Sequence, residues 1–175
     1  MIILQIISYG ISLITTIMGF LEPYCKKMKT ILILNCTGNI LVGCNYLFTQ
    51  SYSGFSICMV AALGVLVNFT FTSKEKKIPI WIIALHAAAF LCVNLLTFSA
   101  WYDLFALIAS MLFVVSVAQS SAKFYRVLFI SNSLVWIFYD FLAGAYANLL
   151  THVILAIGTM GAILYRDVVK KDSAK

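Results

Sequence analysis

Charged side chains are scarce in this chain of 175 residues, at 10% of the total, whereas apolar residues make up 63%. A water-soluble domain is nearer half apolar and about a quarter charged. The scarcity of charge therefore excludes a single soluble globular core, and it indicates an all-α bundle whose solvent is lipid. The net charge is still +6, which can point to nucleic acid, but the positions of the basic residues favour a membrane topology signal instead.

Lysine and arginine are missing from the interiors of the long apolar stretches and from every second connection between them, namely residues 50–54, 99–103 and 145–147. Positive residues flank spanning helices on the cytoplasmic side. The twelve basic residues fall in four clusters, which are Lys26, Lys27 and Lys29; Lys74, Lys76 and Lys77; Lys123 and Arg126; and Arg166, Lys170, Lys171 and Lys175. For all four clusters to share one side, the chain must cross the membrane an odd number of times.

A spanning helix needs about 20 mostly apolar residues. Seven such stretches occur, over residues 2–21, 30–49, 54–73, 78–98, 102–120, 124–143 and 147–166. The sequence thus predicts seven transmembrane helices, with the amino terminus outside and the carboxyl terminus in the cytoplasm. No positive segment precedes the first stretch, so we expect a retained helix and not a cleaved secretory signal. Among interfacial aromatic residues, we expect Trp101 and Tyr102 at the outer boundary and Tyr24, Tyr125 and Tyr165 at the inner one.

The order of basic cluster, helix, short uncharged loop and helix occurs twice, over residues 26–73 and 123–166. Gly64 and Gly158 correspond at a spacing of 94 residues, as do Tyr52-x-Gly54 and Tyr146-x-Asn148. Each copy follows another apolar stretch. We therefore expect two parallel three-helix bundles, residues 1–77 and 100–175, joined by a linker helix in residues 78–99. Parallel repeats about an axis along the membrane normal are a transporter architecture.

A polar stripe interrupts the sixth apolar stretch. Asn132, Trp136, Tyr139 and Asp140 are spaced i, i+4, i+7 and i+8, which places them on one helix face. A carboxyl group in a spanning helix normally faces the bundle interior or a water-filled cavity, although Asp140 lies near the outer end, where headgroup water is the alternative. On the seventh stretch, His152 lies at the depth of Trp136, which suits a ligand site. The alternative is that His152 only forms a hydrogen bond across helices.

The first half offers less polar candidates at equivalent depths. Asn39 and Asn45 lie in the second stretch and Cys58 in the third. Amide and small side chains often hold membrane helices together, but these three are the best candidates to complete a substrate-binding cavity with the stripe of the sixth stretch.

Several chemical signatures are missing as well. The chain has no Gly-rich phosphate loop, no HExxH and no nucleophile elbow, and its five cysteines show no zinc or iron–sulfur spacing. We therefore expect no enzymatic activity, no metal and no cofactor. The expected partners are the lipid bilayer and a small polar solute, without nucleic acid, and a homodimer is left open.

The run from Ser133 to Gly144, Ser-Leu-Val-Trp-Ile-Phe-Tyr-Asp-Phe-Leu-Ala-Gly, resembles the corresponding stretch of the YgjV family of bacterial inner-membrane proteins. The resemblance extends over the whole chain. That family in turn resembles the MtN3-like group of SWEET sugar transporters, half-size SemiSWEETs, PnuC vitamin transporters and PQ-loop proteins. Their three-helix bundles are joined, in full-length members, by a linker helix. The resemblance implies the bacterial inner membrane, with a periplasmic amino terminus, and a SWEET-like 3+1+3 fold.

In SWEET-like proteins a Trp-x-x-Tyr pair on the second helix of a triplet is similar to Trp136 and Tyr139. Their substrate-contacting asparagine follows sixteen positions after the tryptophan, where this chain has His152. The first half has Val42, Asn45 and Cys58 at these three positions. The aromatic pair is therefore kept in one half only, and the asparagine in neither.

The Pro-Gln motif of those transporters is also altered, because Ala118-Gln119 and Leu21-Glu22 stand at the two corresponding helix ends. These departures leave the solute undetermined. The leading hypothesis is a carrier or uniporter for a small polar solute. The alternative is a non-transporting membrane protein, which acts as a sensor or as a subunit of a membrane complex.

Overall fold

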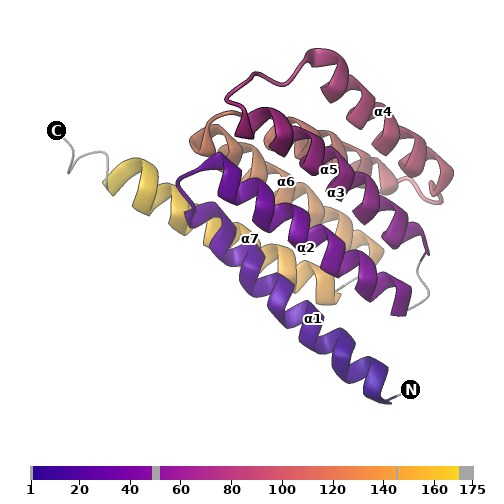
Figure 1. Ribbon diagram of the computed structural model, residues 1–175. Helices are drawn as coiled ribbons and strands as arrows, with labels where there is room; N and C mark the ends of the chain where they lie inside the picture. The colour runs from indigo at the N-terminus through magenta and orange to yellow at the C-terminus, as the bar shows by residue number, and fades with distance from the viewer. Residues whose placement is uncertain (1, 49–51, 145, 170–175) are drawn as a thin grey trace.

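The computed structural model describes residues 2–48, 52–144 and 146–169, with side chains for residues 6–48, 55–144, 146 and 148–169 (Figure 1). These residues form seven α-helices and no strand. The helices are α1 (Ile2–Leu21), α2 (Met28–Phe48), α3 (Tyr52–Ser73), α4 (Ile80–Leu96), α5 (Asp103–Val117), α6 (Ala122–Ala143) and α7 (Tyr146–Ile163). A 3-10 helix η1 (Glu22–Tyr24) follows α1, and a π-helix η2 (Leu164–Val169) follows α7. Each α-helix coincides with one of the predicted apolar stretches.

Proline and glycine set several of the helix ends. α1 ends at Leu21 because Pro23 has no backbone N–H and its ring would clash with the carbonyl of Gly19 in a continued α-helix. α4 begins directly after Pro79, whose backbone is extended. α6 ends at Gly144, which has φ 70° and ψ 17°. Glycine adopts this left-handed conformation without steric cost.

Five helical segments of the described chain are long and apolar enough to cross a membrane, and they belong to α1, α2, α3, α6 and α7 with its π-helical extension. α4 and α5 are shorter, at 17 and 15 residues. At about 1.5 Å per residue they measure roughly 26 and 22 Å, against about 30 Å for the hydrocarbon core of a bilayer. The fold is that of an all-α membrane protein.

The helices are arranged in two rows with α4 at one edge (Figure 1). In the first row α2 lies between α1 and α3, and in the second row α6 lies between α5 and α7. α1 lies against α7, while α3 touches α5 at few positions and α4 contacts both of them. An apolar core joins the rows, made of Met28, Ile31, Leu32, Val65, Val117, Tyr125 and Phe129.

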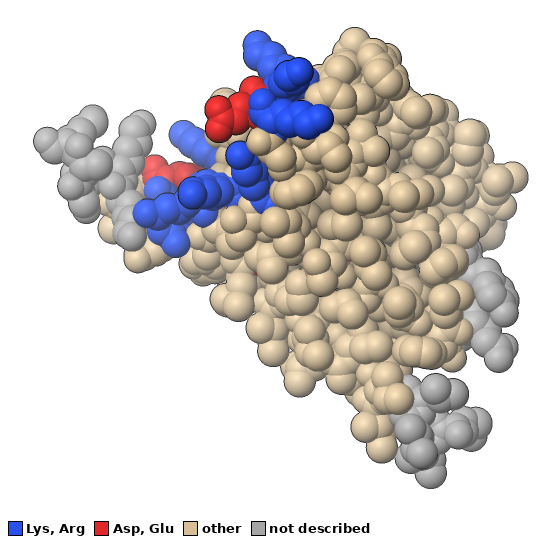
Figure 2. All heavy atoms as spheres, viewed as in Figure 1, with Lys and Arg blue, Asp and Glu red and all other residues tan. Residues whose placement is uncertain are grey.

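Lysine and arginine side chains gather at one end of the bundle, here called the basic end (Figure 2). Long-range hydrogen bonds bring the corresponding helix ends together. Lys29 Nζ of α2 donates to the carbonyl of Ser73 at the end of α3, at 3.3 Å. Arg126 Nη1 of α6 donates to the carbonyl of Pro23, which follows α1, at 3.0 Å. The predicted clusters therefore share one end of the fold, except for Lys170, Lys171 and Lys175, which lie outside the described residues.

The opposite end, here called the far end, contains the α4–α5 and α6–α7 turns. The first of these turns is held by Asp103, whose Oδ2 accepts the backbone N–H groups of Ser99 and Ala100 at 2.7 and 2.8 Å. These bonds tie the residues before α5 to the first residue of that helix and make α4 and α5 a tight hairpin that leaves the basic end and returns to it.

The two glycines that correspond in the predicted repeat both lie at close helix crossings. A Cβ atom on Gly64 of α3 would lie 2.0 Å from His86 Cε1 of α4. A Cβ atom on Gly158 of α7 would lie 2.7 Å from Phe20 Cδ2 of α1. Small residues let membrane helices approach closely, and here only a hydrogen atom fits.

The placement of Tyr125 at the membrane interface is wrong. Its side chain is fully buried and its hydroxyl donates to Glu22 beneath the α1–α2 turn. By contrast, Trp101 is 65% exposed at the far end. The sequence pattern gives the depth of a residue near a helix end, but it does not tell whether that helix face meets lipid or another helix.

Candidate functional site

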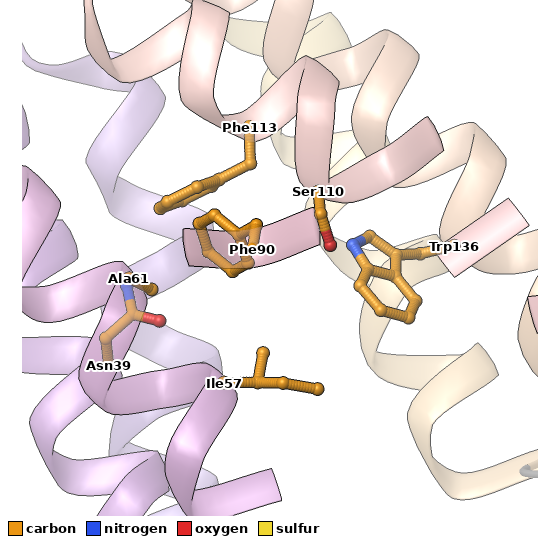
Figure 3. Close-up of a pocket in the computed structure, with 7 residues that line it drawn as sticks. All are labelled: Asn39, Ile57, Ala61, Phe90, Ser110, Phe113 and Trp136. Atoms are coloured by element: carbon orange, nitrogen blue, oxygen red, sulfur yellow. The ribbon is translucent and has the colours of Figure 1, made fainter. Parts of the chain in front are cut away.

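A cavity of about 100 Å³ lies between the two rows, near the middle of the helices that line it, and Figure 3 shows its lining residues. Its lining is mainly apolar and aromatic, with an amide, a hydroxyl and an indole as the polar groups, a composition usual for small-molecule sites. Sites for drug-sized ligands measure about 300 Å³ or more, so this cavity fits a solute of few non-hydrogen atoms. The lining residues are Asn39 of α2, Ile57 and Ala61 of α3, Phe90 of α4, Ser110 and Phe113 of α5, and Trp136 of α6.

Trp136 connects the cavity to a pair of side chains nearer the far end, the partly exposed His152 and the buried Asp140. The indole stacks on the imidazole of His152 from α7, with ring centroids 5.6 Å apart and planes 8° apart. His152 Nδ1 lies 2.7 Å from Asp140 Oδ2. The Asp140 side chain is 2% exposed, so it faces the bundle interior and not headgroup water. Tyr139 packs edge-on against Trp136 at 5.4 Å, which completes the cluster predicted from the stripe.

The first row approaches this cluster through Tyr46 of α2. The Tyr46 hydroxyl interacts electrostatically with Cys58 of its own row and with Tyr139 and Asp140 of the second row. Tyr46 therefore lies close enough to the second row to sense the charge of Asp140.

A second buried polar cluster surrounds Glu22, on the side of the cavity that faces the basic end. Glu22 is 3% exposed. Its Oε1 accepts hydrogen bonds from the Tyr125 hydroxyl of α6 and from Asn35 Nδ2 of α2, the latter at 3.2 Å. Asn39 Nδ2 donates in turn to Asn35 Oδ1 at 3.0 Å. Because Asn39 lines the cavity, a chain of hydrogen bonds connects the cavity to Glu22.

Arg126 closes the basic end beyond this cluster. Its guanidinium binds both carboxylate oxygens of Asp167 in η2, with Nη2–Oδ1 at 2.6 Å and Nε–Oδ2 at 3.0 Å. Both side chains are less than a tenth exposed, and bidentate pairs of this kind are strong. Arg126 Nη1 also donates to the carbonyls of Pro23 and Cys25. Burial raises the pKa of the Cys25 thiol, which keeps this neighbour uncharged.

Three predicted lining residues lie outside the cavity, and two of them connect helices instead. Asn132 Nδ2 donates to the carbonyl of Ala109 in α5 at 2.6 Å. Asn45 Nδ2 donates to Ser12 Oγ of α1 at 3.0 Å. Cys58 is buried within the first row. The cavity itself receives Asn39 and Trp136 from the predicted set, and Tyr139, Asp140 and His152 form the adjoining cluster.

Sequence reasoning did not single out Phe90, Ser110 and Glu22 as site residues. Phe90 carries no signal, since it is one apolar residue among many in the linker helix. Ser110 is anchored by its own bond to the Ala106 carbonyl, which composition cannot reveal. Glu22 could have been identified from the sequence, because it is an acidic residue that directly follows an apolar stretch on the basic side of the fold.

The sequence model of the YgjV family, a family of bacterial inner-membrane proteins, matches residues 6–171. The match covers nearly the whole chain, so this chain belongs to the YgjV family of bacterial inner-membrane proteins. No curated protein and no solved structure matches it.

Proposed function

We propose that this protein is a carrier or uniporter that moves a small polar solute across the bacterial inner membrane through the cavity between its two rows. The observation that carries the proposal is the cavity itself. Asn39 of the first row and Trp136 of the second row both line it (Figure 3). A site shared by two halves of a membrane protein can open to either side when the halves move.

The proposal includes seven membrane crossings with the basic end in the cytoplasm. Basic residues flank spanning helices on the cytoplasmic side, and they gather at one end here (Figure 2). α4 and α5 are short, but as a hairpin they leave the basic end and return to it. Corresponding helices of the two rows therefore cross the membrane in the same direction in this proposal. The amino terminus then lies in the periplasm.

Internal symmetry supports two parallel repeats. The proposed two-fold axis along the bundle would exchange α1 with α5, α2 with α6 and α3 with α7, and the contacts of α1 with α7 and of α3 with α5 are consistent with it. At the spacing of 94 residues, Tyr46 corresponds to Asp140 and Cys58 to His152. Asp140 contacts His152 at 2.7 Å, and Tyr46 lies close enough to Cys58 and to Asp140 to interact with both electrostatically. Equivalent residues that interact in this way are expected close to a symmetry axis.

Two layers of contacts lie on either side of the cavity along the bundle. On the far side, Tyr46 approaches Asp140. On the basic side, Glu22 binds Tyr125 and Arg126 binds Asp167. In the proposed cycle one layer opens while the other stays closed, so that the solute reaches the cavity from one side at a time. Trp136 stacks on an apolar face of the solute, and Asn39 and Ser110 offer it hydrogen bonds.

Flux into liposomes tests this proposal. Purified protein is reconstituted and screened with small polyols and sugars, vitamins and organic ions, and a functional carrier accelerates the entry of at least one of them over empty vesicles. Trp136→Ala abolishes this flux, whereas the matched variant Trp81→Ala, on a residue of α4 that is 64% exposed, retains it. Ala61→Leu fills the cavity and also blocks flux, while Ala84→Leu on the exposed face of α4 does not. An absence of flux for every solute in the screen contradicts the proposal.

The alternative function is that of a sensor or a subunit of a membrane complex, without transport. The small volume of the cavity favours it, as do Leu21-Glu22 and Ala118-Gln119 in place of Pro-Gln motifs. This function requires a partner protein that copurifies in mild detergent. Its binding would survive Trp136→Ala, because that side chain lies inside the bundle.

A further inference from the structure

We propose that Glu22 takes up and releases a proton in each transport cycle, and that Asn35 and Asn39 transmit its protonation state to the cavity. The inference rests on the carrier function proposed above, and it makes the transport proton-coupled. It assigns a binding site to the cluster beside the basic end, which lies apart from Asp140 and His152.

The carboxyl group of Glu22 is buried without an ion partner among its described contacts. Its two hydrogen-bond donors, the Tyr125 hydroxyl and Asn35 Nδ2, are both neutral. A carboxylate buried in this way is costly unless positive charge compensates it. Ionisable groups inside membrane proteins are rare, and they mark ion pathways and proton relays. The site is therefore suited to gain and lose one positive charge.

The neighbouring charged groups are bound elsewhere. Arg126 is paired with Asp167 and donates its remaining described bonds to backbone carbonyls. Arg166 Nε donates to the carbonyl of Tyr24. The other titratable neighbour is the Cys25 thiol, which lies close enough to interact with Glu22 electrostatically. In their described contacts both arginines bind other groups, so the described hydrogen-bond partners of Glu22 are Tyr125 and Asn35.

The surroundings of Glu22 suit a proton better than a metal cation. A metal ion requires several oxygen acceptors around it, whereas Tyr125 and Asn35 both present hydrogen atoms to Oε1. Within the described chain, no cluster of three or more His, Cys, Asp or Glu residues could hold a metal ion. A tyrosine hydroxyl can donate to a carboxylate and accept from a carboxylic acid. The Tyr125–Glu22 contact can therefore persist in both protonation states.

The amide orientations of Asn35 and Asn39 are fixed by their partners. Asn39 Nδ2 donates to the backbone carbonyl of Asn35 at 2.9 Å, and a carbonyl can only accept. The Asn39 amide oxygen is thus left to face the cavity, as Figure 3 shows. Asn39 Nδ2 also donates to Asn35 Oδ1, so Asn35 directs its own Nδ2 to Glu22. The ionised carboxylate of Glu22 and the amide oxygen of Asn39 in the cavity are thus the two ends of one ordered series of hydrogen bonds.

Protonation of Glu22 changes this series of hydrogen bonds. The O–H group of the neutral acid can donate to Asn35 only when that amide turns its Oδ1 toward Glu22, and Asn39 then loses one of the two acceptors that hold it. The Asn39 amide then turns more easily, and the hydrogen-bonding groups offered to a solute change. The affinity of the cavity for its solute thereby depends on the proton at Glu22, and by linkage solute binding changes proton binding by the same factor.

Infrared difference spectroscopy of the full-length protein in liposomes, titrated with acid and base and without any solute, tests the proton site directly. We expect a carboxylic-acid C=O band that disappears as the pH rises. The band is absent in Glu22→Gln, shifts in frequency in Tyr125→Phe and remains in Asp140→Asn. If Glu22→Gln does not fold, the frequency shift in Tyr125→Phe tests whether the band belongs to Glu22. The proposal is overturned if no titrating band depends on Glu22 or Tyr125, or if sodium in place of choline removes the band at constant pH.

Fluorescence of Trp136 tests the coupling to the cavity. In a protein with Trp81→Phe and Trp101→Phe, Trp136 is the remaining tryptophan. Its emission is expected to follow the Glu22 titration, and Glu22→Gln should remove that part of the response. Asn35→Ala should keep the infrared band and lose the fluorescence response. Identical emission titrations with and without Glu22→Gln would overturn the coupling. Neither measurement needs a solute, so a failed flux screen would count against transport and leave the proton site standing.

Discussion

The imidazole of His152 lies flat against the indole of Trp136, with 5.6 Å between ring centroids, while its Nδ1 contacts Asp140 Oδ2 at 2.7 Å. One residue of α7 thus links the aromatic wall of the cavity to a buried carboxyl group of α6. The contact orients the ring, because the hydrogen bond made by one ring nitrogen sets the role of the other.

Replacement of His152 by alanine should destabilise the protein, because Asp140 then remains buried without its partner. Removal of one member of a buried pair costs roughly 3 kcal/mol, and reversible unfolding in mixed micelles measures it. The double variant His152→Ala with Asp140→Leu should recover part of this loss, since the orphaned carboxyl is gone. Strictly additive effects of the two substitutions would show that the pair makes no energetic contact.

Arg126→Ala should be among the most damaging substitutions at the basic end. It leaves Asp167 and two backbone carbonyls without their donor, which costs roughly 3–5 kcal/mol for a buried pair. Lysine at this position cannot reproduce the bidentate geometry, so Arg126→Lys should recover only part of the stability. Lys123→Ala, one turn earlier and exposed, serves as the control and should change stability by less than about 0.5 kcal/mol. Equal unfolding midpoints for the Ala variants at 126 and 123 would refute the role of the Asp167 contact.

Gly64→Ala should displace α4 from α3. The new methyl carbon would lie 2.0 Å from His86 Cε1, and overpacking of this kind costs roughly 1–3 kcal/mol. His86→Ala in the same chain should relieve the strain, since it removes the ring that the methyl group meets. Gly38→Ala on α2, where a Cβ meets nothing within 4 Å, is the matched control. Thermal unfolding in detergent compares the variants, and a harmless Gly64→Ala would argue against the close crossing.

The direction of the chain can be read by cysteine labelling in a background without native cysteines. Ser99→Cys lies in the α4–α5 turn at the far end, and Lys76→Cys lies at the basic end. A maleimide that does not cross membranes should label the first in spheroplasts and the second only after the membrane is permeabilised. The opposite result would invert the topology, and labelling of both from the same side would rule out α4 as a crossing.

The sequence predicts the helices and part of the candidate site because both follow from local patterns along the chain. A stripe with helical spacing brought Trp136, Tyr139 and Asp140 together, and the depth of His152 followed from counting along the next helix. Both are local inferences. The Glu22–Tyr125 contact joins residues 103 positions apart, and it depends on how α6 crosses the α1–α2 turn, which no local pattern contains.

The other predicted lining residues depend on how each helix is rotated about its own axis, and the sequence pattern does not specify which neighbour each helix face meets. Neighbouring positions on an α-helix differ by about 100°, so two amides at similar depth can face different neighbours. Asn39 faces the cavity, whereas Asn132 reaches the backbone of α5 and Asn45 reaches Ser12. Hydrogen bonding between helices and solute binding use the same residue types, so composition alone does not separate the two roles.

The two edges of the bundle are held together in different ways. At the α1–α7 edge, Gly19 and Gly158 let the side chains of Leu155 and Phe20 pack closely against the facing helix, whereas at the other edge α3 and α5 scarcely touch and α4 spans the gap. We therefore expect the rows to pivot about the glycine-lined seam as about a hinge, with the widest displacement beside α4. In that motion α4 would act as a tether that limits how far the two rows separate.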